Sequence, residues 1–214
     1  MQYPNKHNIA ISEWKRKDHY QFFRQFEQPF FGISTEMNCS KAYAYCKAYG
    51  VSFFLFYLHK SLLAANRVKE FRYRIEQEEV YEYERISGSI TVLRRDETFG
   101  FAYFDYQTNF TAFAGTVKQA IDREKTEKGL KPDFNLNSLI HYSVLPGIGF
   151  ASLQHAQLLS SGDSVPKIVF GKLAHRNGQV FLPVSVHVHH ALCDGLHVTR
   201  FLENYQKYLE LEGC

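Results

Sequence analysis

The feature that most constrains the fold is a β-hairpin near the C-terminal end of the 214-residue sequence. Residues 168–175 and 180–190 flank Asn177-Gly178, a dipeptide typical of a tight hairpin turn. Side chains alternate between the two faces of a strand, so one face of the second strand carries Val184, Val186, Val188 and His190. The other face carries Ser185, His187 and His189. The hairpin therefore predicts a sheet with one buried face and places His190 at the end of a buried row.

Helix and strand patterns follow one another along the rest of the chain. Apolar spacing and capping residues predict helices from Ser12 to Phe26, from about residue 40 to Gly50, from Phe53 to Asn66, from about Thr111 to Lys128, and along Val198, Phe201, Leu202, Tyr205 and Leu209. Further strands are predicted at 30–35, 71–75, 80–83, 90–93, 99–104, 140–145 and 150–154. No linker divides these segments. We expect one α/β domain over residues 1–214, a two-layer sandwich of a mixed β-sheet with helices mostly on one face.

Composition excludes several classes of protein. Hydrophobic residues make up 45% of the chain and charged residues 22%, which excludes a disordered or collagen-like chain. The net charge of +3 is too small for a nucleic-acid-binding surface, and the pairs Arg72/Arg74 and Arg94/Arg95 are interpreted as solvated strand faces. The longest apolar run, Phe53 to Leu58, is too short to cross a membrane. We expect neither nucleic acid nor membrane as a partner.

Cysteine spacing and the N-terminal residues indicate the compartment. The four cysteines are Cys39, Cys46, Cys193 and Cys214, and their spacing is not that of a structural zinc site or of a small disulfide-linked protein. The first residues lack the basic region and apolar stretch of a signal peptide. We therefore expect reduced thiols and a cytoplasmic protein.

His190 is the residue of the hairpin that best fits a catalytic role. A histidine at the end of a buried row is partly desolvated, which favours a neutral ring with one nitrogen free as a base. Asp194 follows four residues later, before Gly195 at a strand-to-helix turn, where a carboxylate can organise the loop. Arg16 opens a predicted helix against the helix dipole, which makes it a candidate ion-pair partner for Asp194. A purely structural histidine is the alternative interpretation of His190.

Two other chemistries can be read from the same segment. His187 and His189 lie on one strand face and could share a metal ion, but a third ligand at motif spacing is not visible, so we expect no metal. Cys193 could act as a nucleophile beside His190, but an electropositive setting for a thiolate is missing, so packing is the favoured interpretation.

Four segments together resemble the chloramphenicol acetyltransferase family. Residues 189–195, HHALCDG, resemble the HHxxxDG signature of coenzyme-A-dependent acyltransferases. Residues 14–20, WKRKDHY, are similar to the family's W-x-R-K-x-H-F, and Glu97-Thr98-Phe99 to its E-T-F. Gly171-Lys172 and Leu182-Pro183 match its penultimate hairpin. These motifs keep their order and spacing over essentially the whole chain.

The resemblance implies an acetyl-CoA-dependent O-acetyltransferase with the fold of that superfamily. It implies a homotrimer with active sites at subunit interfaces, where acetyl-CoA and a small aromatic or apolar acceptor such as chloramphenicol meet. His190 would be the general base that takes the proton of the acceptor hydroxyl, and Asp194 would pair with Arg16. The acceptor pocket would be lined by Phe23, Phe31 and Phe99.

Two positions depart from the family pattern. Gly149 stands where the family has a serine that stabilises the oxyanion, and Val169 stands where it has an assisting threonine. Ser143, Ser152 or a backbone N–H could supply the missing donor. The second candidate function is therefore a catalytically attenuated relative that binds CoA or an aromatic small molecule. A metal-binding protein built on His187 and His189 is a third alternative.

Overall fold

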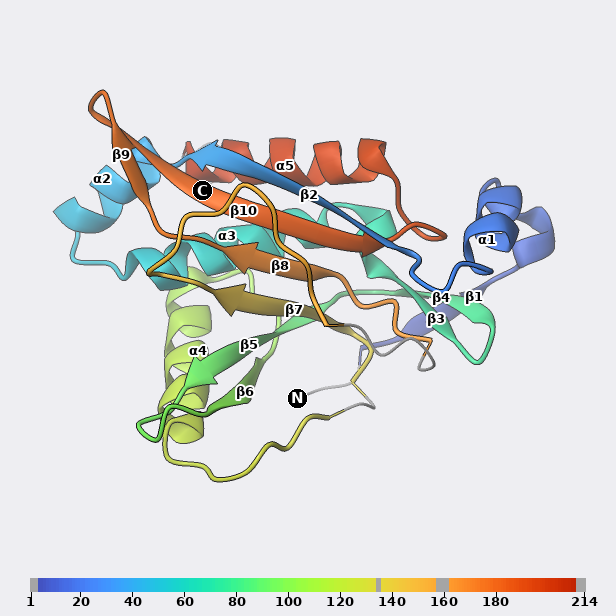
Figure 1. Cartoon of the computed structure of the whole chain (residues 1–214), viewed down its shortest axis with the longest axis horizontal. Coiled ribbons are helices and arrows are strands. Elements are labelled where there is room, and N and C mark those ends of the chain that lie inside the picture. The colour runs from blue at the N-terminus through green and yellow to red at the C-terminus, as the bar shows by residue number, and fades with distance from the viewer. Residues whose placement is uncertain (1–3, 134–135, 157–161, 211–214) are drawn as a thin grey trace.

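The main sheet of the protein contains parallel and antiparallel neighbours. The computed structural model describes residues 4–133, 136–156 and 162–210, so Cys214 lies outside the described residues. The strands lie in the order β2 (Phe30–Asn38), β10 (Gln179–His189), β8 (Lys167–Phe170), β7 (Leu139–Val144), β5 (Ser87–Leu93) and β6 (Phe99–Phe104), and β9 (Ala174–Arg176) pairs with β10 (Figure 1). β7 is parallel to both β5 and β8, and the other pairs are antiparallel. The expected mixed sheet is confirmed.

A second, smaller sheet was not expected. It contains β1 (Lys6–Ile9), β4 (Glu79–Tyr83) and β3 (Tyr73–Glu76), joined as antiparallel neighbours. Short 3₁₀ turns, η1 (Ile11–Glu13) and η2 (Lys69–Arg72), precede α1 (Lys17–Phe23) and β3. The sequence predicted two of these strands but assigned them to one sheet with the others, because strand patterns do not reveal their partners.

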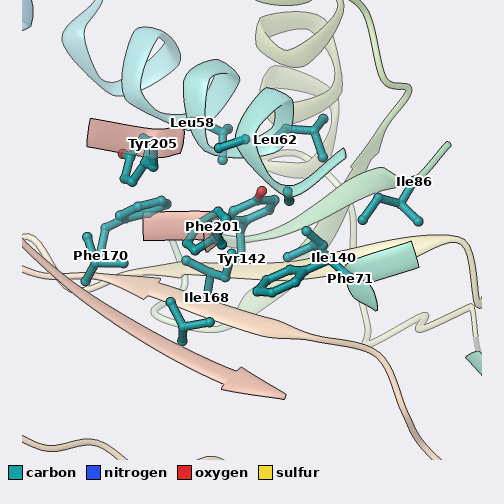
Figure 2. Packing of buried hydrophobic residues seen from close by; sticks show 14 of the residues in the cluster. Leu58, Leu62, Phe71, Ile86, Ile140, Tyr142, Ile168, Phe170, Phe201 and Tyr205 are labelled. Atoms are coloured by element: carbon teal, nitrogen blue, oxygen red, sulfur yellow. The ribbon is translucent and has the colours of Figure 1, made fainter. Parts of the chain in front are cut away.

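The helices pack on the face of the main sheet that carries the valines of β10. They are α2 (Ser40–Ala48), α3 (Phe53–Asn66), α4 (Phe110–Glu124) and α5 (Gly195–Leu209). Figure 2 shows Leu58 and Leu62 of α3 and Phe201 and Tyr205 of α5 packed over strand residues such as Phe170. Burial of these aromatic and branched side chains stabilises the two-layer arrangement. In the described parts of the chain, every helix falls short of the length and hydrophobicity that crossing a membrane requires.

Local capping explains where several elements begin. The hydroxyl of Ser52 accepts a hydrogen bond from Leu55 N at the start of α3, directly before the predicted first residue of this helix, Phe53. The Asn177-Gly178 turn adopts positive φ values of 51° and 74°, as a tight hairpin turn requires. The prediction of one long helix from Ser12 to Phe26 was wrong, because the chain forms η1 first and α1 begins only after Arg16.

Two strand predictions and one surface prediction need correction. Residues 150–154 are irregular, and the predicted strand 168–175 is interrupted at 171–173, where Lys172 N donates to Ile148 O in the turn after β7. Arg74 and Arg94 are buried rather than solvated. The Arg74 guanidinium donates to the carbonyl oxygens of Phe71, Tyr73, Asn137 and Leu139, and Arg94 pairs with Glu124. Internal carbonyl and carboxylate partners, rather than water, satisfy these cations.

Candidate active site

His190 lies directly after β10 and is held by two aromatic rings. Its imidazole stacks on Phe23 of α1, with ring centroids 3.9 Å apart and planes 6° apart. Phe31 of β2 contacts the same imidazole at 4.5 Å. The His190 backbone N–H donates to Pro29 O at 2.8 Å, whereas its ring Nδ1 is buried without a hydrogen-bond partner among the described residues. Ring packing therefore fixes the orientation of this side chain.

Arg16 and Asp194 form an ion pair beside the histidine. The distance from Arg16 Nη1 to Asp194 Oδ2 is 2.6 Å, and Arg16 Nη2 reaches His190 O at 3.5 Å. Asp194 also accepts from Leu196 N and so caps α5. Burial raises the pKa of Asp194, but the hydrogen bond from Arg16 and the nearby charges outweigh it, so the pKa lies below its usual value. The pair joins the start of the chain to the loop after His190.

Two residues that were not predicted from the sequence, His197 and Glu70, extend this network. His197 Nδ1 accepts from the backbone N–H of Asp194 at 3.0 Å, which completes a capping box at α5. His197 Nε2 then lies 3.3 Å from Glu70 Oε1. Burial raises the pKa of Glu70, but the hydrogen bond from His197 outweighs it and the net shift is downward. A histidine three residues after an N-cap aspartate was the available signal for His197, whereas Glu70 carries none.

A cavity of about 1430 Å³ is lined by His189, the neighbour of His190 in the chain, and by residues of β5, β7 and β8. We call it the sheet cavity, and Ser143 and Val169 line it. Strand register places Val169 between Ser143 of β7 and Ser185 of β10. The Ser143 hydroxyl lies 3.1 Å from Thr91 Oγ1, so it already belongs to a hydrogen-bonded pair on the cavity floor.

Phe99 and Gly149 lie apart from His190. Phe99 begins β6, at one edge of the main sheet, is 48% exposed and contacts Phe101 at 5.7 Å. Gly149 is exposed in the turn after β7, which is anchored by the hydrogen bond from Lys172 N to Ile148 O. Within one chain, the structure thus brings Arg16, Asp194, Phe23 and Phe31 to His190, and Ser143 and Val169 to the sheet cavity.

Comparison with known proteins assigns the family. The sequence model of chloramphenicol acetyltransferase matches residues 4–206. The chain belongs to the chloramphenicol acetyltransferase family. The chloramphenicol acetyltransferase of Proteus mirabilis is 25% identical over 207 residues, covering 96% of this chain and 95% of that protein. That of Staphylococcus intermedius is 25% identical over 206 residues, covering 94% and 95%.

Solved structures agree with this family and fold. A chloramphenicol acetyltransferase structure matches with a TM-score of 0.89 and 31% identity, covering 96% of this chain and all of that one. A probable dihydrolipoamide acetyltransferase from Listeria monocytogenes shares the fold, with a TM-score of 0.66 at 13% identity, covering 91% of this chain and 89% of that one. The resemblance to the chloramphenicol acetyltransferase family and the expected acyltransferase fold are confirmed.

His187 and the other polar residues near the signature have hydrogen-bond partners in this member of the chloramphenicol acetyltransferase family. His187 Nε2 lies 3.0 Å from Ser185 Oγ, and His189 Nδ1 accepts from Ala191 N at 3.2 Å. Among the described residues, no group of three or more His, Cys, Asp or Glu side chains is arranged to hold a metal ion. Cys193 is buried, which raises the pKa of its thiol above the usual range, and it donates to Glu70 O. This environment fits a packing role for Cys193.

Proposed function

We propose that this protein transfers the acetyl group of acetyl-CoA to a hydroxyl group of a small acceptor, with His190 as the general base. The observation that carries the proposal is the half-buried imidazole of His190 directly after β10, which contacts the rings of Phe23 and Phe31. The Arg16–Asp194 ion pair lies beside it. Membership of the chloramphenicol acetyltransferase family supports the reaction. The flanking rings suit an aromatic or apolar group of the acceptor, and chloramphenicol is the first acceptor to test.

The reaction needs one base and one donor to the oxyanion. A ring nitrogen of His190 takes the acceptor hydroxyl proton while the hydroxyl oxygen bonds to the thioester carbonyl carbon. The carbonyl π electrons move to oxygen, which gives a tetrahedral oxyanion. When this intermediate collapses, the C–S bond breaks and the CoA sulfur leaves with the proton held by His190. The products are the acetyl ester and the free thiol of CoA.

Three residues assist this reaction: Arg16 and Asp194 hold His190 in place, and Ser143 is a hydrogen-bond donor. Arg16 lies within reach of the His190 carbonyl oxygen and is itself fixed by Asp194, so the pair keeps the backbone of the base in place. Ser143 is our candidate for the donor that replaces the serine absent at Gly149, because its hydroxyl lines the sheet cavity. Val169, which pairs with Ser143 across the strands, lacks the hydroxyl of the threonine that the family has at this position.

We propose further that the active unit is a homotrimer with sites shared between copies. Phe99 is exposed at the edge strand β6, far across the sheet from His190 of the same chain. Sharing between copies would allow the Phe99 side of one chain to meet His190 of the next. We also propose that residues 1–214 form one domain and that the protein is cytoplasmic, which the free, buried thiols of Cys39, Cys46 and Cys193 support.

The test is thiol release from acetyl-CoA by purified protein, with chloramphenicol and a panel of small alcohols. We expect His190→Ala to lower the rate about 10²- to 10⁴-fold. The control His175→Ala removes an exposed histidine on β9 and should retain the wild-type rate. Wild-type turnover in a folded His190→Ala protein would refute the proposal.

The second candidate function is an attenuated relative that binds CoA or an aromatic small molecule. Gly149 and Val169 favour it, because loss of one oxyanion donor costs about 10²-fold or more in rate. Tight CoA binding by calorimetry without thiol release from any acceptor is the result that would select it.

A further inference from the structure

The loop between β10 and α5 is short and begins with the proposed base. Residues 190–194 lie outside helices and strands. The His190 backbone N–H donates to Pro29 O at 2.8 Å, and Arg16 contacts both His190 O and the carboxylate of Asp194. A loop lacks the repeated hydrogen bonds of a helix or sheet, so its shape depends on its contacts with neighbouring elements.

A second set of contacts joins this loop to η2 through Glu70. The Cys193 thiol donates to Glu70 O at 3.3 Å. The Glu70 carboxylate lies 3.3 Å from His197 Nε2. At the other side of the same ring, His197 Nδ1 lies 3.0 Å from the backbone N of Asp194 and 2.9 Å from its Oδ1. Glu70 therefore contacts one loop residue directly and the next one through the imidazole of His197.

η2 is itself held firmly in the core. Phe71, the residue after Glu70, is fully buried and stacks on Phe201 of α5, with ring centroids 5.0 Å apart and planes 21° apart. Figure 2 shows both rings in the hydrophobic cluster. The Arg74 guanidinium donates to Phe71 O at 2.9 Å. Glu70 thus belongs to a closely packed segment that has little freedom to move.

Glu70 and His197 depend on one another because both are buried. Their exposed fractions are 8% and 5%. A buried carboxylate needs a hydrogen-bond donor, and His197 supplies one. Burial raises the pKa of Glu70, but the hydrogen bond from His197 and the charge of Arg200 outweigh it, so Glu70 is ionised at neutral pH. Each side chain therefore fixes the position of the other.

We infer that Glu70 and His197 are positioning residues that hold His190 in place for proton transfer, and we call this pair the loop anchor. The inference rests on the proposed acetyl transfer and adds a second attachment of the loop to that made by Arg16. Displacing a reacting group by about 1 Å can lower a rate about 10²-fold, so a remote contact can control kcat. Both residues lie outside the described lining of the sheet cavity, so they should affect kcat rather than substrate binding.

The first test removes the acceptor of the His197 hydrogen bond. Glu70→Met has a similar volume but lacks the carboxylate, whereas Glu70→Gln retains an oxygen that can accept from His197 Nε2. Thiol release from acetyl-CoA with the best acceptor of the panel, well below each melting temperature, gives kcat and KM. We expect Glu70→Met to lower kcat about 10- to 10²-fold with unchanged KM for both substrates, and Glu70→Gln to remain within about threefold of wild type.

A double-mutant cycle tests whether the two residues act together. His197→Leu should lower kcat at least as much as Glu70→Met, because it breaks the contacts to both Glu70 and Asp194. The double variant Glu70→Met/His197→Leu should be no slower than His197→Leu alone. The matched control Glu203→Met removes an exposed carboxylate of α5 that lines a small surface pocket together with Glu70, and it should leave kcat unchanged.

Amide hydrogen exchange reports on the loop without turnover. The amides of residues 190–194 should exchange about 10-fold faster in Glu70→Met than in wild type, because the loop loses one attachment, whereas the amides of α4 should be unaffected. If Glu70→Met does not fold, Glu70→Asp, which withdraws the carboxylate by one methylene group, provides the same comparison.

The outcomes separate the loop anchor from the proposed function. If kcat depends on His190 but Glu70→Met retains the wild-type kcat, or if the two changes are additive, the loop anchor is wrong and the acetyl transfer stands. A fall in kcat without faster exchange would also overturn the loop anchor, because the loop would not have loosened. If the wild-type protein releases no thiol but Glu70→Met accelerates exchange in the loop, the acetyl transfer is wrong and the attachment of the loop to Glu70 stands.

Discussion

Replacing Asp194 by asparagine separates the charge of this residue from its role as a helix cap. Arg16 is 7% exposed and Asp194 32% exposed, so Asp194→Asn leaves a buried guanidinium without its counter-charge. Breaking a fully buried pair costs about 3–5 kcal/mol, and the partial exposure of Asp194 reduces our expectation to about 2–3 kcal/mol. In a chain of this length, the melting temperature should fall by about 4–12 °C.

Companion variants divide the effect into its parts. Asp194→Ala also removes the cap of α5 and should cost about 1 kcal/mol more than Asp194→Asn. The double variant Arg16→Met/Asp194→Asn removes both charges and should be less destabilised than the sum of the single variants. Urea unfolding provides the free energies. Strict additivity of the two changes would refute the ion pair as the source of the stability.

The pH dependence supplies an independent check. The pKa of Asp194 is lower in the folded protein than its usual value, so the charge contributes stability above about pH 4 and loses it as the pH falls through the folded pKa. The difference between wild type and Asp194→Asn should therefore be full at pH 7 and shrink towards pH 3. A difference of equal size at pH 7 and pH 3 would exclude the charge as its cause.

Three further predictions concern the oxyanion positions, the buried Arg74 and the ring stacked on His190. Gly149→Ser with Val169→Thr restores both hydroxyls, and an added Cβ at Gly149 meets no atom within 4 Å, so kcat for chloramphenicol should rise by up to about 10²-fold in thiol-release assays. An unchanged kcat would show that these two positions do not limit the reaction. Arg74→Met should lower the free energy of unfolding, measured in urea, by about 3 kcal/mol or more, because four buried carbonyl oxygens lose their donor. An equal loss in the exposed control Arg95→Met would contradict a stabilising role specific to Arg74. Phe23→Leu should lower kcat about 10-fold or more with little change in KM for acetyl-CoA, because the stacked ring positions His190. The prediction fails if the control Phe26→Leu lowers kcat equally.

Local signals explain what the sequence could predict. The hairpin turn, the alternation that ends at His190 and the Ser52 cap depend on neighbours within a few residues, so they can be identified without knowledge of the fold. The pairing of Arg16 with Asp194 spans 178 positions and was found because one residue lacked a local partner and the other stood at a turn.

Long-range packing explains what the sequence could not predict. An arginine that alternates with apolar residues looks the same whether water or internal carbonyls receive its hydrogen bonds, so the burial of Arg74 was missed. Residues 150–154 have an apolar pattern but are irregular in the structure, and the ring of Phe150 lies close to Gly171. The sheet cavity requires side chains from β5, β7, β8 and β10 in register, and strand register depends on the assembled sheet.

The four carbonyl contacts of Arg74 have a consequence for how the molecule opens. Its guanidinium links β3 of the small sheet to the backbone at the start of β7 in the main sheet. Detaching the small sheet would expose a cation and leave those carbonyls unsatisfied at once, which disfavours a partly opened state. The amide protons of the two sheets should consequently exchange with solvent at similar opening free energies, as a single cooperative unit.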